Sequence, residues 1–142
     1  MKTIYTIGYE GRNISEFINL LKKNNIKLVI DVRRNPVSRK TGFSKNQFRK
    51  HLIKEGINYI SKTELGVSNN LRNKLKEDKD YNYFFNQYKE YLKFNLTGHI
   101  ALQNLQEILK GNEILLCYEK DYTKCHRKII AEQIKGFKIV HI

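Results

Sequence analysis

The segment from Leu115 to Gly136, LLCYEKDYTKCHRKIIAEQIKG, places three side chains that can do chemistry next to one another. Cys125 is a nucleophile when its thiol is ionised, and His126 can accept or donate a proton near neutral pH. Arg127 offers a planar guanidinium that binds phosphate through two hydrogen bonds. The three residues follow an apolar run and a polar loop, so we expect them at the start of a helix that succeeds a strand.

The predicted position of Cys125 in this helix determines its expected chemistry. If Thr123 is the N-cap, Cys125 is the second helical residue, where free N–H groups and the helix dipole favour an anion. We therefore expect a lowered pKa for the Cys125 thiol, or a phosphate held there with the help of Arg127. Consecutive helical residues point in different directions, so Cys125 and His126 are not expected to partner each other. A partner must come from another loop.

Two further loops carry polar groups that could complete a site. The loop GYEGR follows the first expected strand, and the loop DVRRNPVS follows the second. The candidate catalytic residues are Glu10, Asp31, Glu119, Cys125 and His126. The candidate substrate-binding residues are Tyr9, Gly11, Arg33, Arg34, Ser38 and Arg127. Simpler interpretations stay open for each loop, namely glycines that only permit a turn and carboxylates that only pair with a neighbouring cation.

Cysteine and histidine are also metal ligands. A metal site built on Cys117, Cys125 and His126 would take His141 or His99 as its fourth ligand. However, the Cys-x7-Cys-His spacing matches no structural zinc pattern. Cys117 lies in an apolar run that is typical of a buried strand, where cysteine packs as a small hydrophobic residue. We therefore expect no metal and no cofactor.

Five β-rich runs must position these loops, and they lie at residues 3–9, 27–32, 57–61, 113–119 and 138–142. Most are continuously apolar, as in strands that are covered on both faces. Helical patterns separate them, which predicts an α/β fold: a single three-layer domain over residues 1–142, with a mainly parallel, about five-stranded sheet and helices on both faces. Ligands bind such sheets beyond the carboxyl ends of the strands, where all three polar loops begin.

The helical patterns carry their own start signals. An apolar stripe from Ile14 to Leu21 predicts the first helix. Ser44 and Gln47 predict a capping box ahead of the second. Residues 62–98 have no strand signal and are predicted to form a helical insertion, in which Asp80 caps a helix with an aromatic stripe.

The chain of 142 residues carries a formal net charge of +13, and the resulting field concentrates anionic partners. Eight of its lysines and arginines lie between Val32 and Lys54, a stretch without any acidic residue. Beyond the expected pocket, this stretch offers a candidate nucleic-acid surface of Arg39, Lys40, Lys45, Arg49 and Lys50.

No apolar run is long enough to cross a membrane, and the N-terminus lacks the features of a signal peptide. With only two cysteines, this predicts a cytoplasmic protein without a membrane partner.

Four motifs resemble the domain of unknown function 488 family, in the right order and over nearly the whole chain. They are TIGYEGRNISEF, IDVRRNPVSRKTGFSKNQF, ELG at Glu64 to Gly66, and LLCYEKDYTKCHR. The residues on the family pattern are Tyr9, Glu10, Gly11, Asp31, Arg33, Arg34, Pro36, Ser38, Gly42, Phe43, Glu119, Cys125, His126 and Arg127. Tyr118 departs from it, since a smaller residue is common there, and its phenol either narrows a pocket or fills core. The resemblance implies a compact α/β fold and a shared site, but it names no reaction.

Three functional hypotheses follow from these patterns. The first is an anion-binding pocket at the carboxyl edge of the sheet, possessed by an enzyme that acts on a phosphorylated or nucleotide-like small molecule. The second is a protein that binds or processes nucleic acid through the basic segment 33–54. The third is a non-catalytic polar network, because buried arginine–carboxylate pairs can hold loops in place without any ligand.

Overall fold

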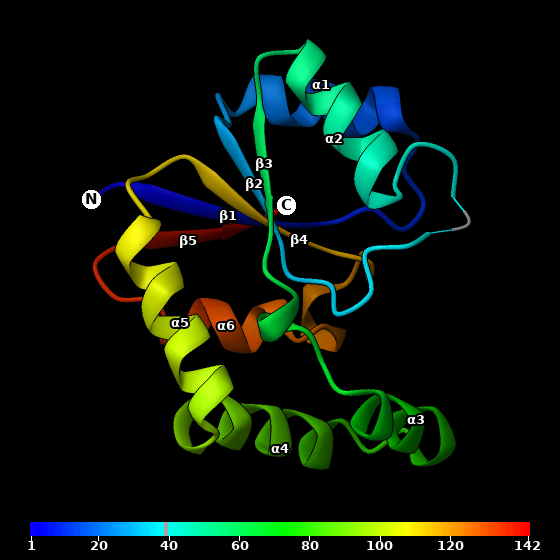
Figure 1. Ribbon diagram of the computed structural model, residues 1–142, viewed down its shortest axis with the longest axis vertical. Coiled ribbons are helices and arrows are strands. Elements are labelled where there is room, and N and C mark those ends of the chain that lie inside the picture. The colour runs from blue at the N-terminus through cyan, green and yellow to red at the C-terminus, as the bar shows by residue number, and fades with distance from the viewer. Residues whose placement is uncertain (39) are drawn as a thin grey trace.

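Five parallel strands form one sheet in the structure, a computed structural model that describes residues 1–38 and 40–142 (Figure 1). The strands are β1 (Thr3–Gly8), β2 (Leu28–Asp31), β3 (Asn58–Ser61), β4 (Glu113–Cys117) and β5 (Lys138–His141). Their order across the sheet is β3-β2-β4-β1-β5, and every neighbouring pair is parallel. The predicted α/β fold is confirmed, and the sheet is wholly rather than mainly parallel.

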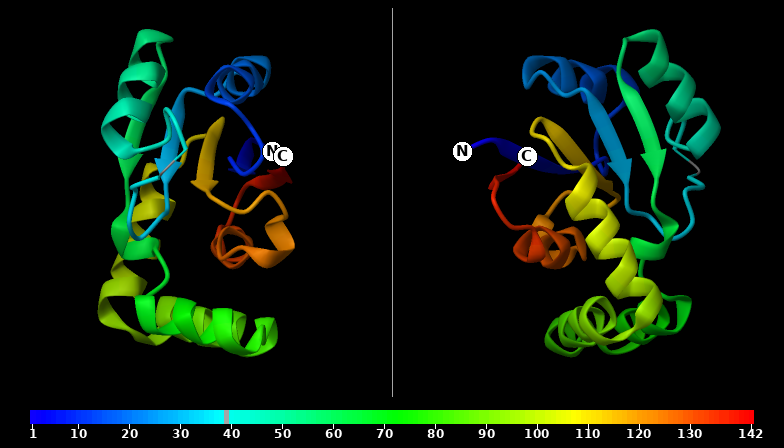
Figure 2. Two further views of the ribbon diagram at one scale, coloured as in Figure 1. Left: turned by 90° about the vertical axis from the view of Figure 1, so that its right-hand side faces the viewer. Right: turned by 60° about the vertical axis from the view of Figure 1, so that its left-hand side comes forward.

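Helices cover both faces of this sheet, as predicted. On one face lie α1 (Ile14–Lys23) and α2 (Lys45–Lys54) (Figure 1). On the other lie α4 (Tyr81–Phe94), α5 (Leu96–Ile108) and α6 (Arg127–Gln133), and α3 (Asn69–Asp78) adjoins α4 (Figure 2). Short 3-10 turns occur at η1 (Thr63–Leu65) and η2 (Tyr122–Lys124). Within the described residues, no helix is long and apolar enough to cross a membrane.

Strand β4 shows how the sheet divides the core, because all five of its residues are buried. Ile114 and Leu116 belong to the hydrophobic cluster beneath α1 and α2, whereas Leu115 and Cys117 belong to the cluster beneath α4, α5 and α6. This alternation is the two-residue period of a strand. Full burial of each of these aliphatic side chains stabilises the fold by about 1.5–3 kcal/mol. Cys117 therefore ends the strand on the α6 side of the carboxyl edge.

The predicted helix starts are only partly correct. Asp80 does cap α4, since its carboxylate accepts a hydrogen bond from the N–H of Tyr83 at 3.0 Å. Ser44 stands at the N-cap of α2 but makes no capping bond, so the predicted capping box is wrong. Its hydroxyl instead donates to the Ser38 carbonyl at 2.8 Å and accepts the Ser38 N–H at 3.0 Å. The Ser44 hydroxyl therefore holds the loop before α2 and does not cap the helix.

The last helix also begins later than predicted. Thr123 lies in the turn η2, and α6 starts at Arg127 with His126 as its N-cap. Asp121 caps η2 instead, accepting hydrogen bonds from the Thr123 N–H at 3.0 Å and from its hydroxyl at 2.6 Å. Cys125 thus precedes the helix and has an extended backbone, with φ −129° and ψ 143°.

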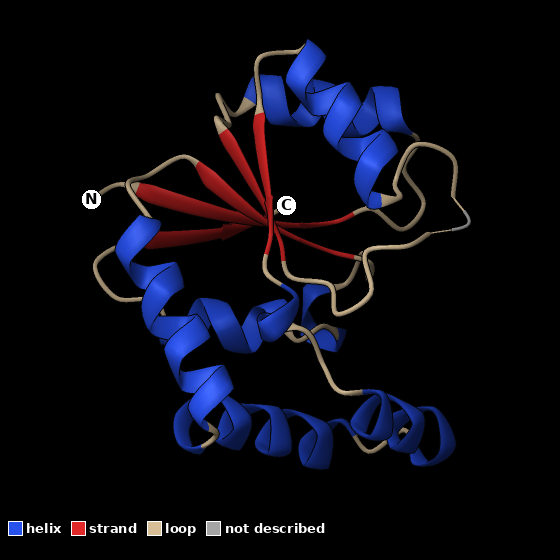
Figure 3. Cartoon of the chain, in the orientation of Figure 1, coloured by secondary structure: helices blue, strands red, loops and turns tan. Residues whose placement is uncertain are grey.

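The strand order creates a crevice at the carboxyl edge. β1 and β2 are followed by helices on one face of the sheet, whereas β4, which lies between them, is followed by α6 on the other face (Figure 3). The chain therefore leaves neighbouring strands in opposite directions. Such a switch point opens a crevice beyond the strand ends, where ligands bind in open parallel sheets.

Candidate functional site

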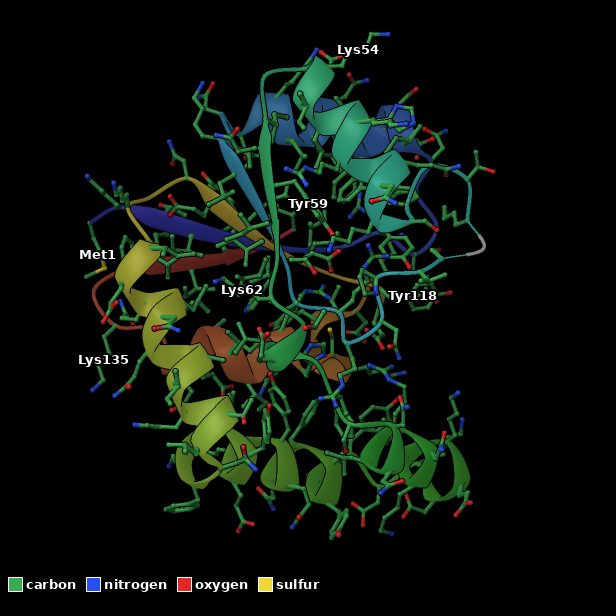
Figure 4. The ribbon with its side chains drawn as sticks, in the orientation of Figure 1. Met1, Lys54, Tyr59, Lys62, Tyr118 and Lys135 are labelled. Atoms are coloured by element: carbon green, nitrogen blue, oxygen red, sulfur yellow. The ribbon has the colours of Figure 1, made fainter. Side chains whose placement is uncertain are left out.

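A cavity of about 260 Å³ opens at this switch point. Its lining comes from the ends of β1, β2 and β4 and from α3: Tyr9, Arg33, Arg34, Asn35, Val37, Arg72, Cys117 and Tyr118. Tyr118 is 47% exposed and stands edge-on to Tyr9, with ring centres 5.3 Å apart. Figure 4 shows Tyr118 beside the loop that follows β2. Its phenol therefore lines a pocket rather than filling core.

Arg33 is buried and paired inside the protein. Its Nη2 and Nε donate to the Asp31 carboxylate at 2.7 and 2.9 Å, and its Nη1 donates to the Phe43 carbonyl at 2.8 Å and the Tyr9 hydroxyl at 3.3 Å. Burial alone would lower the pKa of Arg33, but the hydrogen bonds and charge of Asp31 raise it above its ordinary value. The Tyr59 hydroxyl donates a further hydrogen bond to Asp31. The pair is neutral overall and anchors the loop after β2.

Arg34 and Arg72 also bring positive charge to the cavity, and their charges are less fully neutralised than that of Arg33. Arg34 is exposed, and within the described residues its guanidinium has neither an ion-pair nor a hydrogen-bond partner. Arg72 of α3 lies 3.6 Å from the Glu119 carboxylate. A partly exposed pair of this kind is worth about 0–1 kcal/mol, so it leaves Arg72 able to bind an anion.

The two predicted carboxylates of this region differ in position, since Glu119 lies in the loop after β4 and Glu10 contacts that loop from the turn after β1. Glu119 accepts a hydrogen bond from the Cys117 thiol at 3.2 Å. Burial alone would raise the pKa of Glu119, but hydrogen bonds from its own backbone N–H and from Cys117 lower it below its ordinary value. Glu10 is exposed and accepts the Lys120 backbone N–H at 3.0 Å. Glu119 thus lies next to the cavity residues, while Glu10 faces solvent.

Arg127 is wholly buried and does not line the cavity. Its guanidinium donates to the carbonyls of Glu119 and Lys120 and to the Thr6 hydroxyl. These bonds tie the loop after β4 to β1, which favours the structural interpretation for this residue over phosphate binding.

Two glycines of the family-like motifs permit close backbone contacts around the cavity. A Cβ atom at Gly8 would lie 1.8 Å from the Glu119 carbonyl oxygen. A Cβ atom at Gly66, the last residue of the ELG motif, would lie 2.3 Å from Cα of Arg34. The loops that carry Glu119 and Arg34 can therefore sit where they do only because these positions have no side chain.

Cys125 and His126 come together with Cys117 in a buried cluster beside the cavity. Nδ1 of His126 lies 3.6 Å from the Cys117 sulfur and 3.9 Å from the Cys125 sulfur. The expectation that Cys125 and His126 point apart is wrong, because Cys125 is extended rather than helical. The expected lowering of the thiol pKa is also wrong, since burial raises the pKa of Cys125 well above its ordinary value.

The remaining predicted residues lie away from the cavity lining. Gly11 is exposed in the turn after β1, with a φ of 75°. Ser38 exchanges hydrogen bonds with Ser44 and accepts the Lys40 N–H at 3.1 Å. On the candidate nucleic-acid surface, Lys45, Arg49 and Lys50 are exposed on α2, Lys40 is half-buried, and Arg39 lies outside the described residues.

A second cavity of about 310 Å³ adjoins the first and shares Arg34. Three tyrosines with Leu71 give it an aromatic wall: Tyr83, Tyr88 and Tyr91. The hydroxyl of Tyr91 donates to the Glu64 carbonyl at 2.7 Å, so one tyrosine is held by the ELG motif. The two cavities together offer a basic compartment next to an aromatic one.

Sequence reasoning missed two residues of this region. Arg72 lies in segment 62–98, where no sequence pattern indicates what α3 packs against. Tyr59 gave a weak signal, because a buried tyrosine needs a hydrogen-bond partner and Asp31 ends another strand. The adjacency of β2 and β3 in the observed sheet is what makes that pairing evident.

Comparison with known proteins gives one match. Residues 13–134 match the family described as Domain of unknown function DUF488. No curated protein and no solved structure matches the sequence.

Proposed function

The chain belongs to the DUF488 family, whose description assigns no reaction, and we propose from its geometry that it binds a phosphorylated, nucleotide-like anion. The proposed site is the cavity at the carboxyl edge of the sheet, where Arg34 and Arg72 would contact phosphate. The observation that carries the proposal is the convergence of these two arginines at a topological switch point, with Glu119 as the only carboxylate in an ion pair with either within the described residues.

The hydrogen-bond networks of the region support this assignment, because two of its arginines already have partners inside the protein. Arg33 is neutralised by Asp31, and Arg127 is occupied by backbone carbonyls. These two residues would hold the loops, while Arg34 and Arg72 supply the positive charge. Guanidinium groups suit this purpose, because they bind phosphate through two parallel hydrogen bonds.

The aromatic side chains favour a nucleotide-like ligand over inorganic phosphate. Tyr118 presents a half-exposed ring at the basic cavity, and the adjoining cavity has a wall of tyrosines. Aromatic rings bind nucleobases by stacking, which is worth about 1–3 kcal/mol per base. In an enzyme acting on such a ligand, Glu119 is the predicted proton acceptor nearest to the cavity, since its lowered pKa keeps it ionised at neutral pH.

Calorimetric titration of the full chain with ADP tests this proposal. The double variant Arg34→Ala/Arg72→Ala should bind ADP at least tenfold more weakly, since each charged hydrogen bond is worth about 1.5–3 kcal/mol. The matched control is Lys54→Ala/Lys135→Ala, which removes the same charge at two exposed positions far from the cavity (Figure 4). Equal affinity for wild type and both variants would exclude the cavity as the binding site.

A second candidate function is nucleic-acid binding through α2. The exposed residues Lys45 and Arg49 are four apart and so share one face of the helix, with Lys50 beside them. Reversing all three charges to glutamate should lower duplex affinity and reduce the slope of log affinity against log salt by about 0.9 for each lost phosphate contact. An unchanged slope would remove α2 from consideration without affecting the ADP proposal.

A further inference from the structure

Three side chains of types that ligate metals form a buried cluster to which the proposed anion site assigns no role. Cys117 comes from the end of β4, Cys125 from the segment before α6, and His126 from the N-cap of that helix. One ligand atom from each lies within 4.8 Å of the other two. Each of the three residues is at most 2% exposed.

The orientation of the imidazole is set by a hydrogen bond on its far side. Nε2 of His126 lies 2.9 Å from the Val32 carbonyl oxygen. A carbonyl can only accept, so Nε2 carries the proton and Nδ1 presents its lone pair to the two sulfur atoms. A backbone carbonyl that holds the distal nitrogen of a histidine is the usual outer-shell partner of a metal ligand.

The spacing of the ligand atoms fits a tetrahedral ion. Zinc bonds of about 2.3 Å to sulfur and about 2.0 Å to nitrogen, opened to the tetrahedral angle, hold sulfur and nitrogen about 3.5 Å apart. Nδ1 of His126 is 3.6 Å from the sulfur of Cys117 and 3.9 Å from that of Cys125. An ion could therefore enter with side-chain shifts that draw the three ligand atoms, which lie within 4.8 Å of one another, toward it.

Charge balance and access also suit a divalent ion. Two thiols that release two protons on binding Zn²⁺ become two thiolates, so the total charge of the cluster is unchanged and the burial of a net charge is avoided. Cys117 lines the cavity of about 260 Å³, which supplies an entry path. Glu119, with a carboxylate oxygen 3.2 Å from the Cys117 sulfur, is the nearest further oxygen donor.

We propose that Cys117, Cys125 and His126 bind one zinc ion. Two thiolates and one imidazole are ligands that zinc prefers. The ion would join the end of β4 to the start of α6 across the polar loop, next to the anion cavity. This site goes beyond the proposed function and does not depend on it.

Cobalt titration of the reduced, untagged full chain tests the site directly. One equivalent of Co²⁺ should produce thiolate-to-metal charge transfer and the intense visible bands of a tetrahedral complex, and Zn²⁺ should displace it. Two protons should be released for each bound ion. The variants Cys117→Ser, Cys125→Ser and His126→Gln should each lower affinity at least tenfold, whereas His99→Gln, which changes an exposed histidine of α5, should bind as wild type does.

Two further measurements keep the test independent of folding defects and of the anion proposal. In the wild-type chain, one equivalent of Zn²⁺ should protect both thiols from alkylation. ADP titration of the zinc-free chain separates failure of the metal site from failure of the anion site. Absence of stoichiometric metal binding in the wild type, or formation of a Cys117–Cys125 disulfide that is insensitive to Zn²⁺, would overturn the proposal.

Discussion

Asp31 and Arg33 neutralise each other inside the protein, and Tyr59 completes their network. Replacing one partner of such a group leaves a buried charge or acceptor without its hydrogen bond, which costs more than the bond contributes when formed. Both Arg33 and Arg34 line the cavity, but this network holds the Arg33 guanidinium and leaves that of Arg34 without a partner within the described residues. Tertiary contacts therefore decide which of the adjacent residues Arg33 and Arg34 holds the loop and which is available to a ligand.

We predict that Tyr59→Phe lowers the free energy of unfolding by about 1–3 kcal/mol at neutral pH, because the Asp31 carboxylate loses a buried donor. Burial and the charge of Asp31 raise the pKa of Tyr59, so above about pH 10 the unfolded tyrosine ionises while the folded one keeps its proton. Wild type should then lose stability relative to the variant as pH rises. Urea unfolding at several pH values measures both effects.

Tyr81→Phe is the control for this experiment. The Tyr81 hydroxyl has no hydrogen-bond partner within the described part of the chain, so its removal should change stability by less than about 0.5 kcal/mol. A wild-type advantage over Tyr59→Phe that persists unchanged at high pH would contradict the assigned role of the Asp31 network.

At the scale of elements, the apolar runs predicted the strands well and the start of the last helix poorly. A continuous run such as β4 can bury all of its residues only between two layers, so its position follows from local composition. The start of α6 is harder to predict, because the local sequence does not show whether Thr123 caps the helix or joins a turn capped by Asp121. Asp121 and Thr123 formed a turn with each other, and Cys125 was left extended and buried beside Cys117.

The packing of β1 against the loop after β4 gives a prediction at this scale. Gly8→Ala places a Cβ atom 1.8 Å from a backbone oxygen, so that loop must move. We expect the variant to lose about 1–3 kcal/mol of stability. Calorimetry should also show weakened ADP binding, since Tyr118 and Glu119 move with the loop.

Gly56→Ala provides the matched comparison. Gly56 has a φ of 76° but nothing within 4 Å of a Cβ atom, so the substitution should cost about 1–2 kcal/mol of backbone strain. ADP affinity should be unchanged, because the strain lies far from the cavity. Equal ADP affinities for the two alanine variants would show that the loop after β4 is not part of the site.

At the scale of the whole molecule, the strand order brings together loops that are far apart in the sequence. The predicted carboxyl-edge loops meet only because β4 lies between β1 and β2. Pairing in parallel sheets joins residues distant in sequence, so no local pattern reports it. The same long-range packing brought Arg72 from α3 to the cavity, a contact that no sequence pattern indicated. It also brought Cys117 to the Cys125–His126 pair, a grouping that the sequence offered as a metal site and that its spacing spoke against.

The central claim is that the anion site lies at this switch point rather than on the basic surface of α2. Amide chemical-shift mapping of the full chain during an ADP titration tests it most directly. We predict that the largest saturable shifts occur at Arg34, Asn35, Arg72 and Tyr118, with little change along α2. Largest shifts at Lys45, Arg49 and Lys50, or small shifts spread over the whole basic surface, would contradict it.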